Sequence, residues 1–484
     1  MLAAAPQQPH QTAFLRVILG LALAFGLAIV AAHPLVRRIE RRLGLTVLLS
    51  SGIPFIAMGV IFRLPEVGIL TDEVVADLRP ALEFGVGWLG FVVGMQFDVR
   101  DLDLVPLKTG AVVVAETLVP FALTALACAT FLATLDPSWS LSDQSTWKEG
   151  FREVVTHAPL RDALALGACA AQAAPVAAVA IARGSGSRAA KILSYVTQLD
   201  DVAGVLVLGF ICAAFRPTDA VAAWKLPHIA WIFVTLGMGG VFGILTYALI
   251  RSAKNANEET AYLLGAIALS AGMSGYLAIS PLVTCAIAGA LLTNLPHKNF
   301  DQLKATMLQV ERPLYLIFLL IAGAMWDVTA WQGWLLAPVF VAARVGGKLI
   351  GAHVAKITGP EGLPDATTLG LALAPQSPAA TATVVSYATI YKPHAAEGQS
   401  VGWLMTACIA GGLLTELLVQ TTVRLRGGLR IDLRGSSMVS IPAALDVSGS
   451  IPAASEVSPA PPAPDPPAMT EPPPPDAPHE GGSS

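Results

Sequence analysis

Two adjacent acidic residues, Asp200 and Asp201, lie in a stretch from Lys191 to Arg216 that is otherwise almost wholly apolar. In a membrane helix, a rise of about 1.5 Å per residue places Asp200 roughly 14 Å from Lys191, near the middle of a hydrocarbon layer ~30 Å thick. Each carboxylate costs about 2.5–3.5 kcal/mol at that depth, and the neighbouring negative charge adds to the cost. The pair therefore predicts compensation by a basic side chain elsewhere in the chain and by a bound cation or proton.

Adjacent positions of a helix point about 100° apart, so the two acids cannot face one cavity and we expect them to have different roles. The only basic residues inside apolar stretches are Arg344 and Lys348, one helical turn apart. Lys348 follows two glycines that let another helix approach closely, and a desolvated lysine releases its proton more readily than an arginine. Lys348 is therefore the predicted partner of one acid. Arg344 is predicted to form a permanent structural pair with another intramembrane acid, Glu116 or Glu416.

The composition excludes an ordinary soluble globule, because hydrophobic residues make up 54% of the 484 residues and charged residues only 13%, against about a quarter charged in soluble domains. The net charge of −4 argues against nucleic acid as a partner. The five cysteines fall in apolar runs without CxxC spacing, so we expect buried thiols rather than disulfides or metal ligands. The chain is predicted to be an all-α polytopic membrane protein.

Thirteen candidate membrane helices are found as apolar runs bounded by charged residues, Pro or Gly. They lie near residues 14–33, 45–62, 80–97, 104–134, 162–183, 189–216, 227–251, 260–277, 279–295, 312–329, 333–356, 367–391 and 401–424. An odd number of spans puts the termini on opposite sides, and Lys and Arg are more frequent in the loops that share a side with the C-terminus. We therefore expect the N-terminus outside and the C-terminus in the cytoplasm, in a multi-pass protein of the cell (inner) membrane.

These spans define one membrane transporter domain at 14–424, preceded by a short N-terminal segment at 1–13. The segment 425–484 becomes rich in Pro, Ala, Ser and acidic residues towards its end. Its apolar surface is too small to offset the entropy lost on ordering. We therefore predict a disordered cytoplasmic tail.

A weak internal repeat runs through the membrane domain. The segment Gly94–Val99 (GMQFDV) is similar to Gly323–Val328 (GAMWDV), and the surroundings of Pro175 are similar to those of Pro378. The two pairs fall into one register once the polar loop at 136–161 is left out. The chain is therefore predicted to contain two related halves.

The halves, near 80–216 and 312–424, begin on opposite faces of the membrane, because two spans precede the first and nine precede the second. Inverted-topology repeats are typical of secondary transporters, which bind substrates near the midplane at discontinuous helices. Pro175 in the first half, and Pro375 and Pro378 in the second, are predicted to break these helices because proline cannot continue the hydrogen-bond ladder. The fold is therefore predicted to have two discontinuous crossing helices.

Two stretches, Leu199–Gly204 (LDDVAG) and Gly347–Gly351 (GKLIG), resemble motifs of the cation:proton antiporter superfamily, and specifically of its thirteen-helix bacterial sodium/proton exchangers. Trp88–Asp98 and Pro281–Gly289 are similar to further stretches of that family, and the resemblance covers roughly residues 14–424. It implies that Asp201 takes either a cation or protons and that Asp200 forms a breakable pair with Lys348. It also implies a homodimer with the first helix at the interface, and an elevator-like movement of a six-helix core.

Two departures from the family pattern concern the ion ligands. The first-half break reads Ala173-Ala174-Pro175, where relatives often carry a hydroxyl, and the second reads Gln376-Ser377-Pro378, where many carry an Arg-Gly-Glu. Other side chains could supply oxygen ligands in their place. The candidates are Gln172, Thr197, Gln198, Gln376 and Ser377.

The sequence thus predicts an electrogenic antiporter rather than an enzyme, exchanging cytoplasmic sodium, or else lithium or potassium, for external protons. Deprotonated acids coordinate a hard cation through oxygen, and protonation evicts it. We expect a role in pH homeostasis, contacts with membrane lipid, and no cofactor or metal beyond the transported ions. An electroneutral exchanger, a sodium-coupled organic-anion symporter on the same architecture and a non-transporting scaffold or sensor are the alternatives. The physiological cation, the stoichiometry and the pH set point stay open.

Overall fold

A computed structural model of the chain describes residues 52–100, 107–135, 158–175, 187–217, 226–296, 300–393 and 398–425, with Ala22 and Gly26. This described part contains fourteen helices and no β-strand, which confirms the predicted all-α class. Five of the helices are long and apolar enough to cross a membrane. The N-terminal segment, nearly all of the first predicted span and the tail lie outside the described residues, so the number of thirteen spans stays a prediction.

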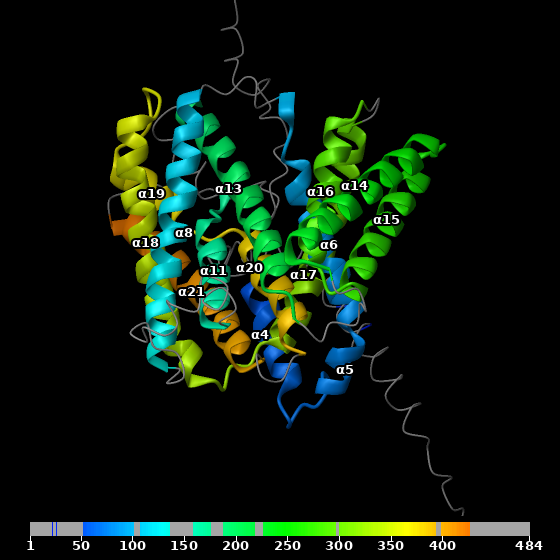
Figure 1. Cartoon of the computed structure of the whole chain (residues 1–484), viewed down its shortest axis with the longest axis horizontal. Helices are drawn as coiled ribbons and strands as arrows, with labels where there is room; N and C mark the ends of the chain where they lie inside the picture. The colour runs from blue at the N-terminus through cyan, green and yellow to red at the C-terminus, as the bar shows by residue number, and fades with distance from the viewer. Residues whose placement is uncertain are drawn as a thin grey trace, which may run out of the picture. The chain divides into compact units, whose positions relative to one another are not determined.

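Seven helices, which we call the core group, pack on one another around the two acids of α13 (Figure 1). They are α8 (Leu107–Leu135), α11 (Ala158–Ala171), α13 (Ser187–Ala214), α18 (Trp331–Thr358), α19 (Ala366–Leu373), α20 (Pro378–Tyr391) and α21 (Gly398–Leu425). Gly347 allows α18 and α8 to meet closely, because a β-carbon there would lie 2.5 Å from Cα of Pro120. This close approach fits the packing role predicted for the glycines beside Lys348.

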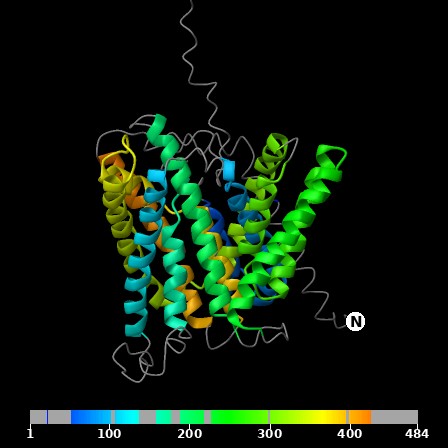
Figure 2. The same ribbon diagram turned by 45° about the horizontal axis from the view of Figure 1, so that its top comes forward.

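The remaining seven helices form what we call the scaffold group. They are α4 (Ile53–Arg63), α5 (Asp72–Asp77), α6 (Arg79–Met95), α14 (His228–Ser252), α15 (Ala256–Tyr276), α16 (Pro281–Asn294) and α17 (Phe300–Met325). α6 and α16 touch backbone to backbone, since a β-carbon at Gly94 would lie 1.9 Å from the carbonyl oxygen of Ala286. α13 and α20 of the core group also contact the scaffold group. Figure 2 shows α13 standing between α8 and the pair α14 and α15.

Two helices differ from the predicted spans. α17 begins at Phe300 rather than near residue 312, because hydropathy reports only its apolar part, whereas its first turns carry Asp301, Lys304 and Glu311. The short helix α5 was not predicted, because it carries acids in its first turn and lies in a polar connection. Neither difference changes the position of the helices that hold the acids.

Both predicted helix breaks are present, and they lie side by side. α11 ends at Ala171 and α19 ends at Leu373, and the residues that follow, 172–174 and 374–377, are not helical. These two non-helical segments form an antiparallel bridge between Ala173 and Gln376, and the N–H of Ala174 donates to the carbonyl of Pro375 at 2.8 Å. α11 and α19 therefore both stop at a crossing, as predicted for the two discontinuous helices, and α20 continues the second one. The continuation of the first after Pro175 lies outside the described residues, and the inverted relation of the two halves stays a prediction.

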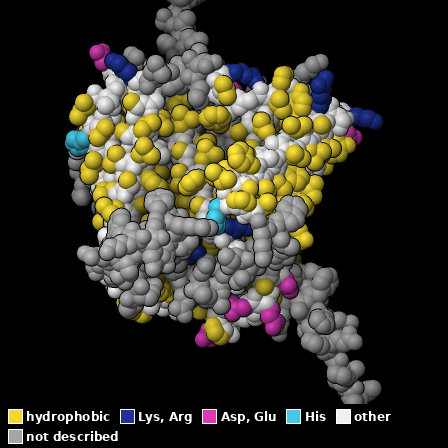
Figure 3. All heavy atoms as spheres, viewed as in Figure 1, with side chains coloured by type: hydrophobic (Ala, Val, Ile, Leu, Met, Phe, Trp, Pro, Cys, Tyr) yellow, Lys and Arg dark blue, Asp and Glu magenta, His cyan; other side chains and the backbone are white. Residues whose placement is uncertain are grey.

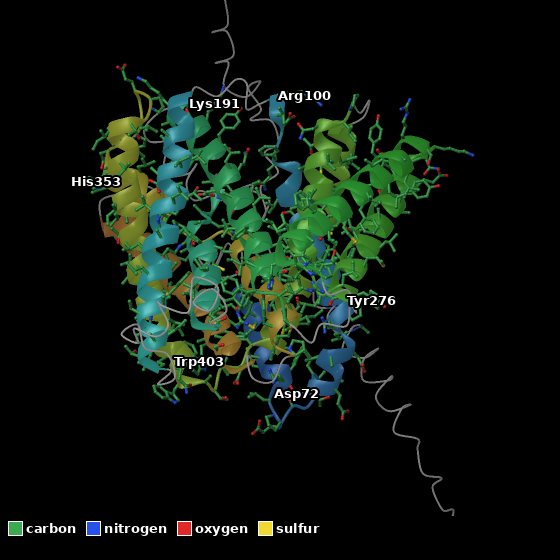
Figure 4. All side chains as sticks on the ribbon, in the orientation of Figure 1. Asp72, Arg100, Lys191, Tyr276, His353 and Trp403 are labelled. Atoms are coloured by element: carbon green, nitrogen blue, oxygen red, sulfur yellow. The ribbon has the colours of Figure 1, made fainter. Side chains whose placement is uncertain are left out.

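Charged side chains gather at two opposite ends of the molecule in the view of Figure 3, with apolar side chains between them. Arg100 and Lys191 lie at one end, and Asp72 lies at the other (Figure 4). Large apolar side chains of α14 face outward between these ends, since Phe233 is 69% exposed and Val241 65%. Such an apolar surface is typical of lipid-facing helices.

Candidate functional site

Asp200 and Asp201 are both buried, with 0% and 1% of their surface exposed, and they face different partners. Asp200 Oδ2 lies 3.3 Å from Lys348 Nζ, and its Oδ1 accepts a hydrogen bond from the N–H of Ala173 at 3.4 Å. Asp201 Oδ2 accepts a hydrogen bond from the hydroxyl of Ser377 at 2.9 Å, whereas its Oδ1 has no hydrogen-bond partner among the described residues. The predicted divergence of the two side chains, and the predicted Asp200–Lys348 contact, are therefore present.

Lys348 binds more than the carboxylate. Its ammonium group donates to the carbonyl oxygens of Ala171 at 2.7 Å and of Glu116 at 2.9 Å. Ala171 is the last residue of α11, so the positive charge sits at the negative end of a half-helix. With Asp200 as the third acceptor, all three N–H groups of the ammonium are occupied.

Arg344 differs from its prediction, because backbone carbonyls and not a carboxylate accept its hydrogen bonds. The five acceptors are the carbonyl oxygens of Cys169, Ala170, Gln172, Ala374 and Pro375, at 2.6–3.2 Å. The predicted pairing with Glu116 or Glu416 is therefore wrong for the described residues. The physical reason is that the two broken helices leave their last carbonyls without intrahelical donors, and a guanidinium has five donors to satisfy them.

Among the predicted supporting ligands, Ser377 is the one that contacts an acid. It is the N-cap residue of α20, so its hydroxyl and the positive end of that half-helix both stabilise negative charge on Asp201. The hydroxyl of Thr197 donates within its own helix, to the carbonyls of Leu193 and Ser194. Gln198 likewise bonds to Ser194, at 3.1 Å. Both therefore make local contacts in this state.

The two glutamines flank the helix crossing. The amide of Gln172 donates to Thr383 Oγ1 at 3.0 Å and packs against Gly204, where a β-carbon would lie 2.2 Å from its nitrogen. The amide nitrogen of Gln376 lies 2.9 Å from Sγ of Cys408, and its oxygen has no hydrogen-bond partner among the described residues. The crossing thus holds two buried oxygens that lack donors, those of Asp201 and Gln376. Unsatisfied carboxylate and amide oxygens are the ligands that hard cations prefer.

A second buried polar cluster was missed from the sequence. Asp162 accepts hydrogen bonds from the guanidinium of Arg161, at 2.8 Å, and from the hydroxyl of Tyr387. The guanidinium carbon of Arg161 also lies 4.3 Å from the ring centre of Tyr391. The adjacent opposite charges in α11, and two tyrosines one turn apart in α20, were signals that could have found it. The side chains of this cluster therefore connect α11 to α20.

His353, five residues after Lys348 in α18, does not belong to the site. Figure 4 shows it at the outer edge of α18. Its side chain is exposed, and its Nδ1 lies 2.7 Å from the carbonyl oxygen of Leu349 in the same helix. The titratable groups close to Asp201 are therefore those of the core group interior.

The sequence matches one family model, and the structure is similar to solved structures of one protein. Residues 24–420 match the family model described as sodium/hydrogen exchanger, transmembrane. Two structures of the sodium proton antiporter MjNhaP1 from Methanocaldococcus jannaschii are similar. The structure at pH 8 has a TM-score of 0.59 and 14% identity, covering 88% of this chain and 100% of that chain. The structure from an electron microscopy map has a TM-score of 0.52 and 16% identity, covering 83% and 95%. No curated protein matches the sequence.

Proposed function

The chain belongs to the sodium/hydrogen exchanger family, and we propose that it is a secondary active antiporter that exchanges a monovalent cation for protons. Sodium is the first candidate for the cation, with lithium and potassium as further candidates. One observation carries the proposal: Asp201 is buried where two broken helices cross, and one of its oxygens has no hydrogen-bond donor. A carboxylate in that position requires a cation or a proton to neutralise it.

The exchange follows from competition at Asp201. In its deprotonated form the carboxylate binds the cation through oxygen. The side-chain oxygens of Ser377 and Gln376 lie nearby as further ligands for the cation. Protonation removes the charge that holds the cation, so each ligand displaces the other. In the described state Asp200 is neutralised by Lys348.

Transport requires that the core group cross between the two sides only when Asp201 is neutralised. An unpaired charge on Asp201 moving through a low-dielectric region costs several kcal/mol, and a proton or a cation bound to Asp201 removes that cost. The protein therefore couples the two fluxes without an energy source other than the ion gradients. Neither a catalytic residue nor a cofactor takes part in this scheme.

The proposed setting is the cell (inner) membrane, with the N-terminus outside and the C-terminus in the cytoplasm. The basic end that carries Arg100 and Lys191 faces the cytoplasm in this orientation, in line with the usual excess of positive charge on that side. We further propose a homodimer that forms through the first predicted helix at 14–33. The proposed orientation and the proposed dimer rest on the sequence and the family resemblance.

The substitution Asp201→Asn tests the proposed function, since it keeps the size of the side chain and removes its charge. We expect sodium-dependent proton flux in everted membrane vesicles to fall to the level of vesicles that lack the protein. Glu66→Gln is the matched control, because this acid is exposed in the connection after α4. Unchanged flux in Asp201→Asn would rule out Asp201 as the exchange site.

A further inference from the structure

Glu116, in the first half of α8, is a third buried acid near the two acids of α13. Its side chain is 0% exposed, and neither of its carboxylate oxygens has a hydrogen-bond partner among the described residues. An ionised carboxylate without any donor is among the most costly groups to bury, and the neutral acid is far less costly. Glu116 therefore carries a proton in the state described here.

Lys348 is the basic residue next to Glu116. Its ammonium group already donates to the backbone carbonyl of Glu116, at 2.9 Å. The carboxyl group of Glu116 lies over Gly351, less than one turn after Lys348 in α18, where a β-carbon would be 3.4 Å from Oε2. A rotation of the lysine side chain towards Gly351 would bring the ammonium group from Asp200 to the carboxyl group of Glu116.

The charged groups that act on Glu116 come from two of the three helices packed against α8. They are Lys348 of α18 and Asp200 of α13. The third helix, α11, carries Arg161 and Asp162, which pair with each other in its first turns. Arg344, one turn before Lys348, gives its donors to backbone carbonyls. Within the described residues, Lys348 is thus the cation that Glu116 and Asp200 share.

We propose that Glu116 is a second proton-carrying group of the exchange, and that Lys348 alternates between Asp200 and Glu116. When Lys348 pairs with Asp200, Glu116 is a neutral acid. When Lys348 turns to Glu116, the O–H bond of that acid breaks, its proton leaves to water on the open side, and the carboxylate pairs with the ammonium group. This inference rests on the proposed function, because it adds a second proton to the same cycle.

The charge balance shows what the second proton does. In the proton-loaded form, Asp201 and Glu116 are neutral and Asp200 pairs with Lys348, so these four side chains carry no net charge. In the cation-loaded form, Asp201 is neutralised by the cation, Glu116 is neutralised by Lys348, and Asp200 is left with one negative charge beside the cation. Two protons therefore leave for each monovalent cation that enters, and the exchange is electrogenic. Lys348 stays protonated in this scheme, because a carboxylate, that of Asp200 or of Glu116, is its partner in each form.

Calorimetry of the purified full-length protein measures this directly. Sodium is titrated at one pH in buffers of different ionisation enthalpy, which gives the number of protons released for each sodium bound. We expect about two protons for the wild type and about one for Glu116→Gln, with sodium binding retained in both. Glu83→Gln is the matched control, because Glu83 is a buried acid of α6 that pairs with Arg79 in the scaffold group.

The possible outcomes separate the two proposals. Equal proton release in the wild type and Glu116→Gln, or loss of sodium binding in Glu116→Gln, would overturn the role of Glu116. No sodium-linked proton release in the wild type would instead overturn the proposed antiport. If Glu116→Gln does not fold, Glu116→Asp keeps the acid, and we expect it to release about two protons with a shifted pH midpoint. Release of one proton by Glu116→Asp at every pH, with two by the wild type, would contradict the proposal.

Discussion

The two acids of α13 differ in what neutralises them, and this difference decides which acid exchanges its ligand. Asp200 receives a full positive charge from Lys348, whereas Asp201 receives one uncharged hydroxyl from Ser377. A hydroxyl orients a carboxylate without cancelling its charge, so Asp201 still needs an ion. The assignment of the exchange site to Asp201 therefore has a physical basis beyond family resemblance.

The pair of Asp200 and Lys348 gives a prediction at the residue scale. Lys348→Ala leaves Asp200 as an unpaired buried charge, and breaking a buried ion pair in this way costs about 3–5 kcal/mol. Asp200→Asn combined with Lys348→Ala removes both charges, so we expect the double variant to be more stable than Lys348→Ala. The measurement is the midpoint of thermal unfolding of the purified protein for both single variants and the double variant.

Additive losses in that series would contradict the account, because residues that interact are expected to show coupling when both are replaced. Asp98→Asn combined with Lys348→Ala is the control, since Asp98 lies in the connection after α6, beside Arg100. We expect the changes in unfolding midpoint caused by Asp98→Asn and Lys348→Ala to add up in this double variant.

At this scale the sequence predicted the contact of Asp200 with Lys348, because few basic side chains lie inside apolar stretches and the lysine had few possible partners. It did not predict the partners of Arg344. Those partners are backbone carbonyls, which every residue has, and they become free only where two helices stop at the same place. It also did not predict that Glu116 would lie beside Lys348 without a hydrogen-bond donor.

At the scale of the elements, the site depends on the helix crossing. α11 and α19 end close together, so their negative ends would repel each other without a positive charge between them. Arg344 provides that charge and bonds to the last carbonyls of both helices. The N-terminus of α20, with its cap residue Ser377, lies against Asp201 on the other side of the break. Opposite helix ends thus stabilise opposite charges within one small region.

The substitution Arg344→Lys tests this role, because it keeps the charge but reduces the donors from five to three. At least two carbonyls are then left without a donor, at about 1–3 kcal/mol each. We expect a clear fall in the thermal unfolding midpoint. Arg251→Lys is the control, since Arg251 is exposed in the last turn of α14. Equal midpoints for the two variants would show that charge alone, and not the number of donors, matters at Arg344.

The prolines predicted where the helices break, because proline has no N–H and its ring obstructs the preceding turn. The sequence did not predict that the two non-helical segments would bridge at Ala173 and Gln376, since this contact depends on the packing of helices far apart in the chain. The start of α17 was also missed, because hydropathy stops where charged residues begin, whereas a helix continues into the polar region.

At the scale of the whole membrane domain, alternating access requires the core group to move against the scaffold group. Hydrogen bonds at several points join the two groups in the described part of the chain. The hydroxyls of Ser280 and Ser386 lie 2.8 Å apart, and Lys392, directly after α20, donates to the carbonyl of Met325 at 2.8 Å. Arg216, just after α13, donates to the carbonyls of Leu277 and Ala278, and the indole of Trp326 donates to Thr406 of α21 at 2.9 Å. These bonds would have to break or be exchanged in such a movement. Rigid-body movement of one group past the other is a common form of domain motion.

The sequence predicted the class of this architecture from composition and the spacing of apolar runs. It did not predict which helices form each group, because helices of similar hydropathy differ mainly in the small residues that set close contacts, such as Gly94 against Ala286. The sidedness of the membrane domain rests on the distribution of Lys and Arg, and it stays a prediction.

Competition between sodium and protons at Asp201 is the central claim, and the sodium dependence of transport currents tests it most directly. The wild-type protein is reconstituted in vesicles on a solid-supported membrane, and currents after sodium jumps are recorded across a series of pH values. In the acidic range, the sodium concentration for half-maximal current should rise by about tenfold or more for each unit that the pH falls, because at least one proton must leave before sodium binds. A half-maximal sodium concentration that does not change with pH would contradict the account.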